Sequence, residues 1–193
     1  MLEMPNLIKL LKDSDKQFVT HKHKALFSVG DSEDNRGEIE GAHTKNLFLK
    51  NKKNHFCLFS CEENSIINLK QLSKTINTNN LSFAKEEYLL KYLGIRPGSV
   101  SPYALLNDKE NKVSFYLEDR LYDSKKINFH PLINTATVNI KKEVFYNFFK
   151  TNYDNAKFAN ISAEVDELYI FPSKTSHSTS ENKTTFERIS ISA

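Results

Sequence analysis

The first quarter of the chain carries hydrophobic patterns that predict a helix followed by strands. Leucines recur at helical spacing after Pro5, a good first-turn residue, and predict a short amphipathic helix that ends near Ser14. Apolar positions alternate over residues 17–29 and predict one or two strands. Residues 31–36 are polar and indicate one helical turn and a loop before Gly41.

Two apolar runs in the next stretch predict a β-hairpin. Residues 46–50 and 56–61 are separated by a polar turn. The first run contains the tripeptide LFL, which is typical of a buried strand. Lys45 and Asn46 are therefore expected at or just inside the mouth of that strand.

The remainder of the chain mixes helical and strand patterns without a regular βαβ rhythm. Helices are expected over 68–76, 85–93 and 141–149, and strands over 113–117, 127–130 and 135–140. The second of these helices is expected to stop at Gly94. Residues 96–102 contain two prolines and a glycine, which predicts a stiff loop. This mixture predicts an α+β domain with a mixed sheet.

The composition fits one globular domain followed by a tail. The chain has 193 residues, of which 39% are hydrophobic, and its 14 Phe and 8 Tyr allow a packed core without disulfides or metals. We expect the domain to span residues 1–153. Residues 154–193 are expected to form a C-terminal extension, in which 165–171 docks back as a strand or helical turn and 173–185 is mobile.

Charge is distributed unevenly between these parts. Residues 1–150 carry a net charge of +5 and residues 151–193 a net charge of −2. A mildly basic body permits RNA binding, although strong nucleic-acid binders are usually more basic. The N-terminus lacks a continuous apolar signal segment, and no apolar run approaches membrane-spanning length. A soluble, cytoplasmic protein without a membrane partner is expected.

The cysteines and histidines predict no metal site. Cys57 and Cys61 lie in one apolar run, and strand alternation turns both thiols toward the core together with Phe59. Their spacing lacks the second ligand pair of a zinc site, and the histidines show no metal-ligand spacing. Free buried thiols in a reducing compartment, with no metal and no cofactor, are expected.

Three stretches carry residues that could bind or react with a substrate, and for each of them a purely structural role is the alternative. Lys45 and Asn46 on a rigid strand form a receptor for a phosphate or carbonyl oxygen, or else a solvated lysine and a structural amide. Gly98 lets the backbone approach a ligand, or serves a rigid turn. His130 lines a pocket, or is a core histidine satisfied by the backbone. Ser99 lacks His and Asp partners at a recognisable spacing and is not expected to be a nucleophile.

Three segments in fixed order resemble one family. GAHTKNLFLKNKK, LSFAKEEYLLKYLGIRPGSVSPYALLND and NFHPLINTATV, which lie between Phe18 and Phe149, are similar to the YbaK/ProX family of prolyl-tRNA editing proteins, nearest the free-standing Ala-tRNA(Pro) deacylases. The resemblance implies a mixed, partly barrel-like β-sheet packed with helices. It also implies hydrolysis of the ester between a wrong amino acid and the 3′-terminal adenosine of tRNA(Pro).

The resemblance implies site residues as well. The family lysine matches Lys45, followed here by Asn46, the GxxxP loop begins at Gly98, and the histidine before proline is His130. These four are the expected catalytic residues. The expected substrate-binding residues around them are His43, Thr44, Ser99, Val100, Ser101, Pro102 and Phe129.

The implied partners are the acceptor end of tRNA(Pro) and, as a second partner, prolyl-tRNA synthetase, with a monomer favoured. An aminoacyl ester is already activated, so a positioned water and a stabilised oxyanion suffice for its hydrolysis, with the substrate's ribose hydroxyl as a further source of assistance. Alternatives are a deacylase for Cys-tRNA(Pro) or another misacylated tRNA, and a non-catalytic module that binds tRNA or a synthetase. A small-metabolite hydrolase is disfavoured, because nothing marks a carboxylate or cofactor site.

Overall fold

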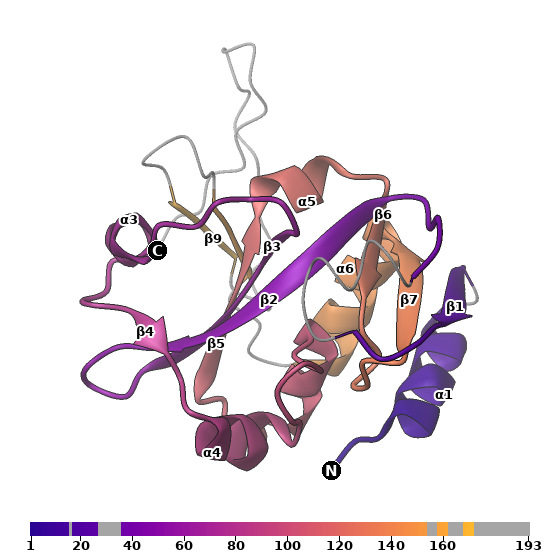
Figure 1. Cartoon of the computed structure of the whole chain (residues 1–193), viewed down its shortest axis with the longest axis horizontal. Helices are drawn as coiled ribbons and strands as arrows, with labels where there is room; N and C mark the ends of the chain where they lie inside the picture. The colour runs from indigo at the N-terminus through magenta and orange to yellow at the C-terminus, as the bar shows by residue number, and fades with distance from the viewer. Residues whose placement is uncertain (16, 27–35, 154–157, 162–167, 172–193) are drawn as a thin grey trace.

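The computed structural model describes residues 1–15, 17–26, 36–153, 158–161 and 168–171 (Figure 1). Its strands are β1 (Phe18–Lys22), β2 (Ala42–Lys50), β3 (Phe56–Glu62), β4 (Ser82–Phe83), β5 (Val113–Glu118), β6 (Lys126–Phe129), β7 (Ala136–Lys141), β8 (Phe158–Ile161) and β9 (Leu168–Phe171). Its helices are α1 (Met4–Ser14), α3 (Leu69–Thr75), α4 (Glu86–Tyr88), the π-helical η1 (Leu89–Leu93), the 3₁₀ helix η2 (Pro102–Asn107), α5 (Asp119–Asp123) and α6 (Lys142–Asn152).

The strands form one mixed sheet in the order β1-β7-β6-β2-β3-β5-β8-β9, with β4 paired to β2 beside this path. The pairs β2–β6, β3–β5 and β5–β8 are parallel, and the other pairs are antiparallel. The predicted α+β class with a mixed sheet and packed helices is confirmed. Among the described residues the two end strands do not pair with each other, so the sheet is open.

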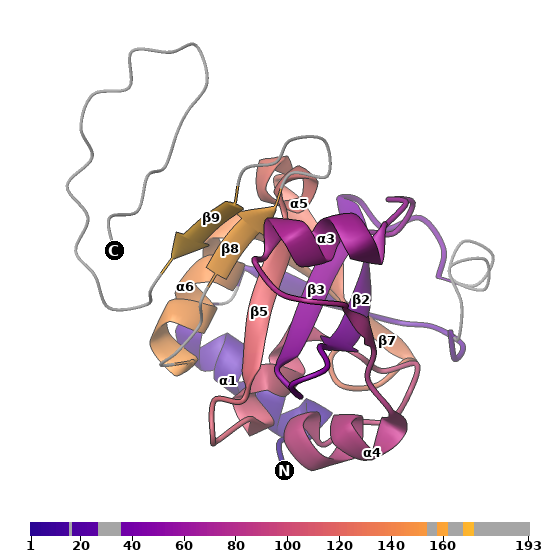
Figure 2. The same ribbon diagram turned by 90° about the vertical axis from the view of Figure 1, so that its left-hand side faces the viewer.

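Helices cover both faces of the sheet (Figure 2). One face packs against α1, η2 and α6 around an aromatic core, in which Phe145 stacks on Phe129 with ring centroids 4.8 Å apart. Tyr103 of η2 meets the edge of the Phe129 ring at 6.0 Å. The other face packs Leu72 of α3 onto β2 and β3 in a smaller second core.

The thiol prediction is confirmed. Cys57 and Cys61 are both buried and free, and both belong to the second core with Phe59. Burial raises the pKa of the Cys57 thiol to about 12, so this thiol stays protonated and unreactive at neutral pH.

Strand β2 is longer than its apolar run predicts. It starts at Ala42 because its first two residues pair with β6, while β3 pairs with it from Thr44 to Lys50. Lys45 and Asn46 are consequently the fourth and fifth residues of the strand and pair with β3. They lie inside the strand and not at its first residue, because β6 supplies a partner for Ala42 and His43 that the local sequence does not reveal.

Gly41 is the residue that allows β2 to pair with β6. Its φ is +98°, and a Cβ at this position would lie 2.6 Å from the backbone oxygen of Lys126. Such a contact forces the two strands apart, since neither atom belongs to a flexible side chain. The backbone conformation also disfavours any residue that carries a Cβ.

Gly41→Ala should therefore lower the free energy of unfolding by about 1–3 kcal/mol or more, because strain and a backbone clash act together. Urea denaturation measures this loss. The matched control is Gly37→Ala, because Gly37 has φ +70° but open space where a Cβ would lie. A loss at position 41 no larger than that at position 37 would show that the approach to Lys126 is unimportant.

The remaining local predictions divide into those the structure confirms and those it extends. The N-terminal helix, the hairpin, the helix capped at Asn68 and the helix at 142–152 are confirmed. The helix before Gly94 is present but winds as a π-helix in its second half. The sequence did not reveal α5 or β8.

Part of the N-terminal and C-terminal predictions lies outside the described residues. This applies to most of 27–36 and to 173–185. The docking strand predicted within 165–171 is confirmed as β9, which pairs with β8, and β8 extends the sheet beside β5. The division of the chain at residue 153 stays a prediction. No helix in the described ranges is long and apolar enough to cross a lipid bilayer.

Candidate active site

Alternation along β2, β6 and β7 creates a face that is polar and lies opposite the aromatic core. It carries His43 and Lys45 from β2, Asn128 from β6, and Thr137 and Asn139 from β7; we call these five residues the polar face. Asn128, Thr137 and Asn139 are nonetheless buried. Buried polar side chains need partners: Asn128 and Asn139 bond to each other and to the backbone, and Thr137 bonds to His23 Nε2 at 2.9 Å.

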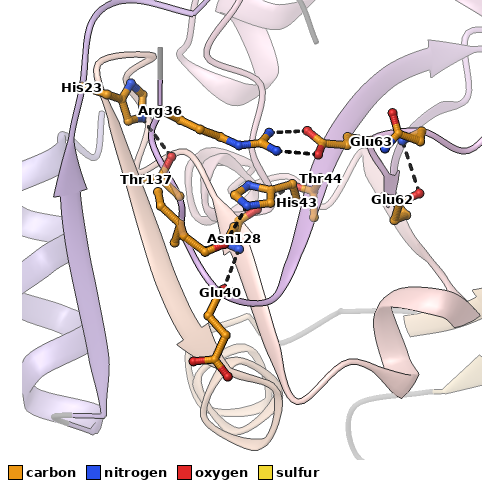
Figure 3. A network of polar contacts seen from close by, with 11 residues as sticks. His23, Arg36, Glu40, His43, Thr44, Glu62, Glu63, Asn128 and Thr137 are labelled. Carbon is orange, nitrogen blue, oxygen red and sulfur yellow. Dashed lines mark hydrogen bonds and ion pairs between the residues drawn. The ribbon is translucent and has the colours of Figure 1, made fainter. Parts of the chain in front are cut away.

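The polar face is tied together by amide side chains. Asn139 donates from Nδ2 to Asn128 Oδ1 at 2.8 Å and to the backbone oxygen of Glu40 at 2.7 Å. Asn128 Nδ2 also donates to that Glu40 oxygen, at 3.1 Å (Figure 3). These bonds hold the segment at Glu40, which leads into β2, against β6 and β7.

Lys45 lies where the polar face meets the second core. It pairs with Cys61 across the hairpin, and its half-buried side chain donates a hydrogen bond from Nζ to the backbone oxygen of Ser65. An ammonium group has three donors, so two remain available for a ligand. The alternative of a freely solvated lysine does not match this anchored side chain.

Asn46 does not share this face. Successive strand residues point to opposite sides, so Asn46 lies with Phe48 toward the aromatic core. Its Oδ1 accepts a hydrogen bond of 2.5 Å from the buried hydroxyl of Ser60. The structure thus separates the Asn46 side chain from the Lys45 ammonium, with the strand between them.

His130 lies at the same end of the β2–β6 pair as Lys45. The parallel register pairs His43 with Asn128, and Lys45 and His130 each follow two residues later in the same direction. Residues paired in this way point to one face. Lys45 and His130 are therefore both on the polar side of the sheet, but the pairing of β2 with β6 ends at His43 and β6 itself ends at Phe129, so no strand register relates the two side chains.

The His130 ring has a fixed orientation. Its Nδ1 lies 2.9 Å from the backbone oxygen of Ala136, which makes Nδ1 the donor and leaves the Nε2 lone pair free in the neutral ring. Burial lowers the pKa of His130, and the nearby His23 lowers it further, while the Ala136 bond opposes the shift. The two imidazole centroids are 5.9 Å apart.

Stability should fall in mild acid because of His130. Its folded pKa lies below the ordinary value of 6.5, so between these two values the unfolded chain binds more protons than the folded one. The free energy of unfolding should therefore rise with pH across that window and be lost as pH falls through it. Urea titrations between neutral pH and pH about 5 measure this slope.

A His130→Asn variant should show a shallower slope, whereas Val19→Ala, which trims an exposed side chain without a titratable group, should keep the slope of the parent protein. Equal slopes in all three proteins would contradict a buried neutral His130. His43 should contribute in the same direction, because burial lowers its pKa too.

His43 and Thr44 make contacts that hold the site together. His43 Nε2 donates to the backbone oxygen of Ile39 at 2.9 Å, and Thr44 donates to the backbone oxygen of Asn128 at 2.7 Å. Arg36 and Glu63 form a two-pronged ion pair beside His43, with distances of 2.5 and 2.8 Å (Figure 3). The hydroxyl and the imidazole predicted to bind substrate are thus both engaged within the protein.

The Gly98 loop packs toward the aromatic core. Gly98 has φ +83° and is exposed, and the Ser99 N–H closes a turn onto the backbone oxygen of Arg96 at 3.2 Å. Val100 packs against the aromatic core, and Tyr103 contacts Phe129, the neighbour of His130. Among the described residues, no hydrogen bond joins this loop to Lys45 or His130.

Three predicted substrate-binding side chains are buried: Ser101, Pro102 and Phe129. Ser101 accepts a hydrogen bond from the Tyr103 N–H at 3.4 Å and so caps η2. These side chains form the support of the loop and of His130. Direct substrate contact by any of them stays a prediction.

Sequence reasoning missed the two serines that orient the site. Ser60 orients the Asn46 amide, and Ser65 anchors Lys45. A signal was available for Ser60, since a lone polar residue inside the apolar run FCLFSC is informative. In the part of the chain that the structure describes, no three His, Cys, Asp or Glu residues are placed to hold a metal ion.

Comparison with known proteins identifies a common family. A family model for the aminoacyl-tRNA editing domain matches residues 23–148. The chain is 33% identical over 154 residues to the prolyl-tRNA synthetase associated domain-containing protein 1 of Xenopus laevis, covering 77% of this chain and 91% of that protein. It is 32% identical over 140 residues to the prolyl-tRNA editing protein ProX of Acetoanaerobium sticklandii, covering 70% and 84%.

The fold is shared with solved structures. A crystal structure of a candidate trans-editing enzyme for prolyl-tRNA synthetase aligns with a TM-score of 0.59 at 14% identity, covering 83% of this chain and 97% of that one. The crystal structure of hypothetical protein APE2540 aligns with a TM-score of 0.60 at 13% identity, covering 76% and 93%. At these identities the likeness concerns the fold.

Proposed function

Because the chain belongs to the aminoacyl-tRNA editing domain family, we propose that it is a trans-editing deacylase that hydrolyses mischarged tRNA(Pro), with Ala-tRNA(Pro) as the preferred substrate. The proposed catalytic domain is residues 1–153, acting in the cytoplasm as a monomer without cofactor. The names of the relatives, which refer to prolyl-tRNA editing and to prolyl-tRNA synthetase, support this substrate and a synthetase partner.

The observation that supports the proposal is that Lys45 and His130 are both on the polar side of the sheet, each two residues beyond the His43–Asn128 pair that joins β2 to β6. An anchored ammonium with two free donors suits either the phosphate of the terminal adenosine or the oxyanion that develops on the ester carbonyl. A neutral imidazole with a free Nε2 suits the α-amino group of the amino acid or the attacking water.

The other predicted catalytic residues have supporting roles in this proposal. Asn46 supports the site from the opposite side of β2, where its amide oxygen accepts the Ser60 hydroxyl. A role for Gly98 and the following backbone N–H groups at the substrate carbonyl rests on the resemblance of the GxxxP loop alone. No covalent nucleophile takes part, because the ester needs only a placed water and a stabilised oxyanion.

The preference for alanine over proline must come from exclusion of the larger ring. A missing methylene changes binding by only about 1–3 kcal/mol, too little for strong discrimination by affinity alone. In this proposal the substrate side chain lies against His130, in a space too small for a pyrrolidine that still admits cysteine or serine. Cys-tRNA(Pro) is therefore the substrate to compare first.

The test is deacylation of tRNA(Pro) charged separately with alanine, cysteine, serine and proline. Alanine should be released fastest and proline should be retained, with alanine on a tRNA of another identity as the control for tRNA recognition. Release of no amino acid would contradict the proposal, and binding of uncharged tRNA(Pro) in that case would indicate a non-catalytic module.

A further inference from the structure

Glu118, which no sequence pattern marks as functional, has a carboxylate in the interior of the protein. It ends β5, and its relative exposure is 0%. Its two oxygens accept hydrogen bonds of 2.8 Å from the Ser65 hydroxyl, and one of them accepts the Glu62 N–H at 2.8 Å. A buried carboxylate is costly unless such bonds satisfy it, so these three contacts hold the 62–65 turn firmly.

The same turn holds Lys45. The hydroxyl of Ser65 faces Glu118, while the backbone oxygen of Ser65 accepts the Lys45 ammonium. The pKa of the Cys61 thiol is affected by both charged groups. Burial, followed by the Glu118 carboxylate, raises the pKa of Cys61 to about 12, and the Lys45 ammonium opposes the shift. The two charges thus lie near one thiol, with Ser65 bridging them.

We propose that Glu118 is a positioning residue for Lys45 and acts through Ser65. This inference deepens the proposed function and rests on it for its catalytic consequence. A lysine side chain carries substantial rotamer entropy, and a substrate that had to order it would bind and react less well. Glu118 fixes the turn, the turn fixes the Ser65 oxygen, and that oxygen holds the ammonium before substrate arrives.

A purely structural role would have different consequences. If Glu118 only stabilised the 62–65 turn, its loss would lower stability and leave the environment of Lys45 unchanged in the folded protein. If it positions Lys45, its loss frees the ammonium even where the fold is intact. The chemical reactivity of the Lys45 amine distinguishes these cases, and it requires no tRNA.

The experiment is brief acetylation with acetic anhydride, followed by mass spectrometry of each lysine, on the full chain and on Glu118→Gln and Ser65→Ala. Ser65→Ala keeps the backbone oxygen that accepts Lys45 and removes only the link to Glu118. Both variants should acetylate Lys45 about three- to tenfold faster, the scale of one ordinary hydrogen bond, because the Ser65 oxygen that accepts Lys45 stays but is no longer held in place. The internal control is Lys126, which pairs with Glu40 at 2.7 Å and should react at an unchanged rate.

Kinetics supply the second readout. In deacylation of Ala-tRNA(Pro), both variants should lower kcat with little change in KM, and the double variant should lose no more than the larger single loss. Unchanged Lys45 reactivity in a folded Ser65→Ala protein, or equal acceleration at Lys126, would overturn the inference. Because acetylation is read without substrate, an inactive parent protein would refute the proposed function and leave this result interpretable.

Discussion

Lys45→Ala is expected to lower kcat/KM for Ala-tRNA(Pro) by about 10²–10³-fold, the usual cost of removing one group that stabilises an oxyanion. Lys45 is the only lysine or arginine among the five residues of the polar face, and its ammonium is anchored on the backbone oxygen of Ser65. No neighbouring residue of that face replaces the charge. Single-turnover deacylation with excess enzyme measures the residual rate.

The fold should survive this change. Lys45 is half-buried and its removal takes away one hydrogen bond to the backbone, so the free energy of unfolding should change by about 1 kcal/mol. Lys50→Ala is the matched control, because Lys50 is on the same strand and bonds the Asn54 side chain at 3.0 Å, outside the site. A normal rate in Lys45→Ala, or an unfolded Lys45→Ala protein, would assign this lysine a structural role instead.

Phe145→Ala should cost about 3–5 kcal/mol of stability, the range for removing a fully buried aromatic side chain. Its ring is 0% exposed and lies 4.8 Å from both Phe129 and Phe149, by ring centroids. The cavity left behind lies under β6 and η2, two well-packed elements that cannot close it. Chemical denaturation of the variant measures the loss.

Phe145→Ala should also disturb the candidate active site, because residues next to the site pack on this ring. Phe129 precedes His130, and Tyr103 follows the Gly98 loop, so both lose a supporting ring in Phe145→Ala. Val19→Ala, which trims an exposed side chain on the edge strand β1, should change stability by less than about 0.5 kcal/mol. A loss of similar size in the two variants would mean that the aromatic core does not carry the stability assigned to it.

Local structure was largely predictable from the sequence. Helix α1 follows from Pro5 and the spacing of its leucines, and the β2–β3 hairpin follows from two apolar runs around a polar turn. The end of η1 at Gly94 follows from the left-handed conformation that glycine adopts readily, here with φ +64°. In each case the determining residues lie within a few positions of the feature.

Features that depend on distant partners were not predictable in this way. The start of β2 depends on β6, some 85 residues later, and β8 is a strand because β5 offers an edge to it. The same applies to the site. The Ser65–Glu118 hydrogen bond joins residues 53 positions apart, and neither the residue types nor their spacing predicts it.

The separation of Asn46 from Lys45 has a physical reason. Outside a strand, adjacent side chains can turn toward one ligand. Inside a strand, adjacent side chains point to opposite faces. The sequence alone does not show which case holds, because the first residues of β2 are polar and give no periodic signal.

Strand β2 has hydrogen-bonded neighbours along both edges, and this restricts how the protein can diversify. Inserting or deleting one residue between Ala42 and Lys45 would turn every later side chain of the strand to the reverse face, and a shift of one residue would bring Thr44 or Asn46 to the position of Lys45. Homologous lineages that acquire new amino-acid preferences must therefore do so by altering the connections around this strand. Its own length is expected to be invariant among functional descendants.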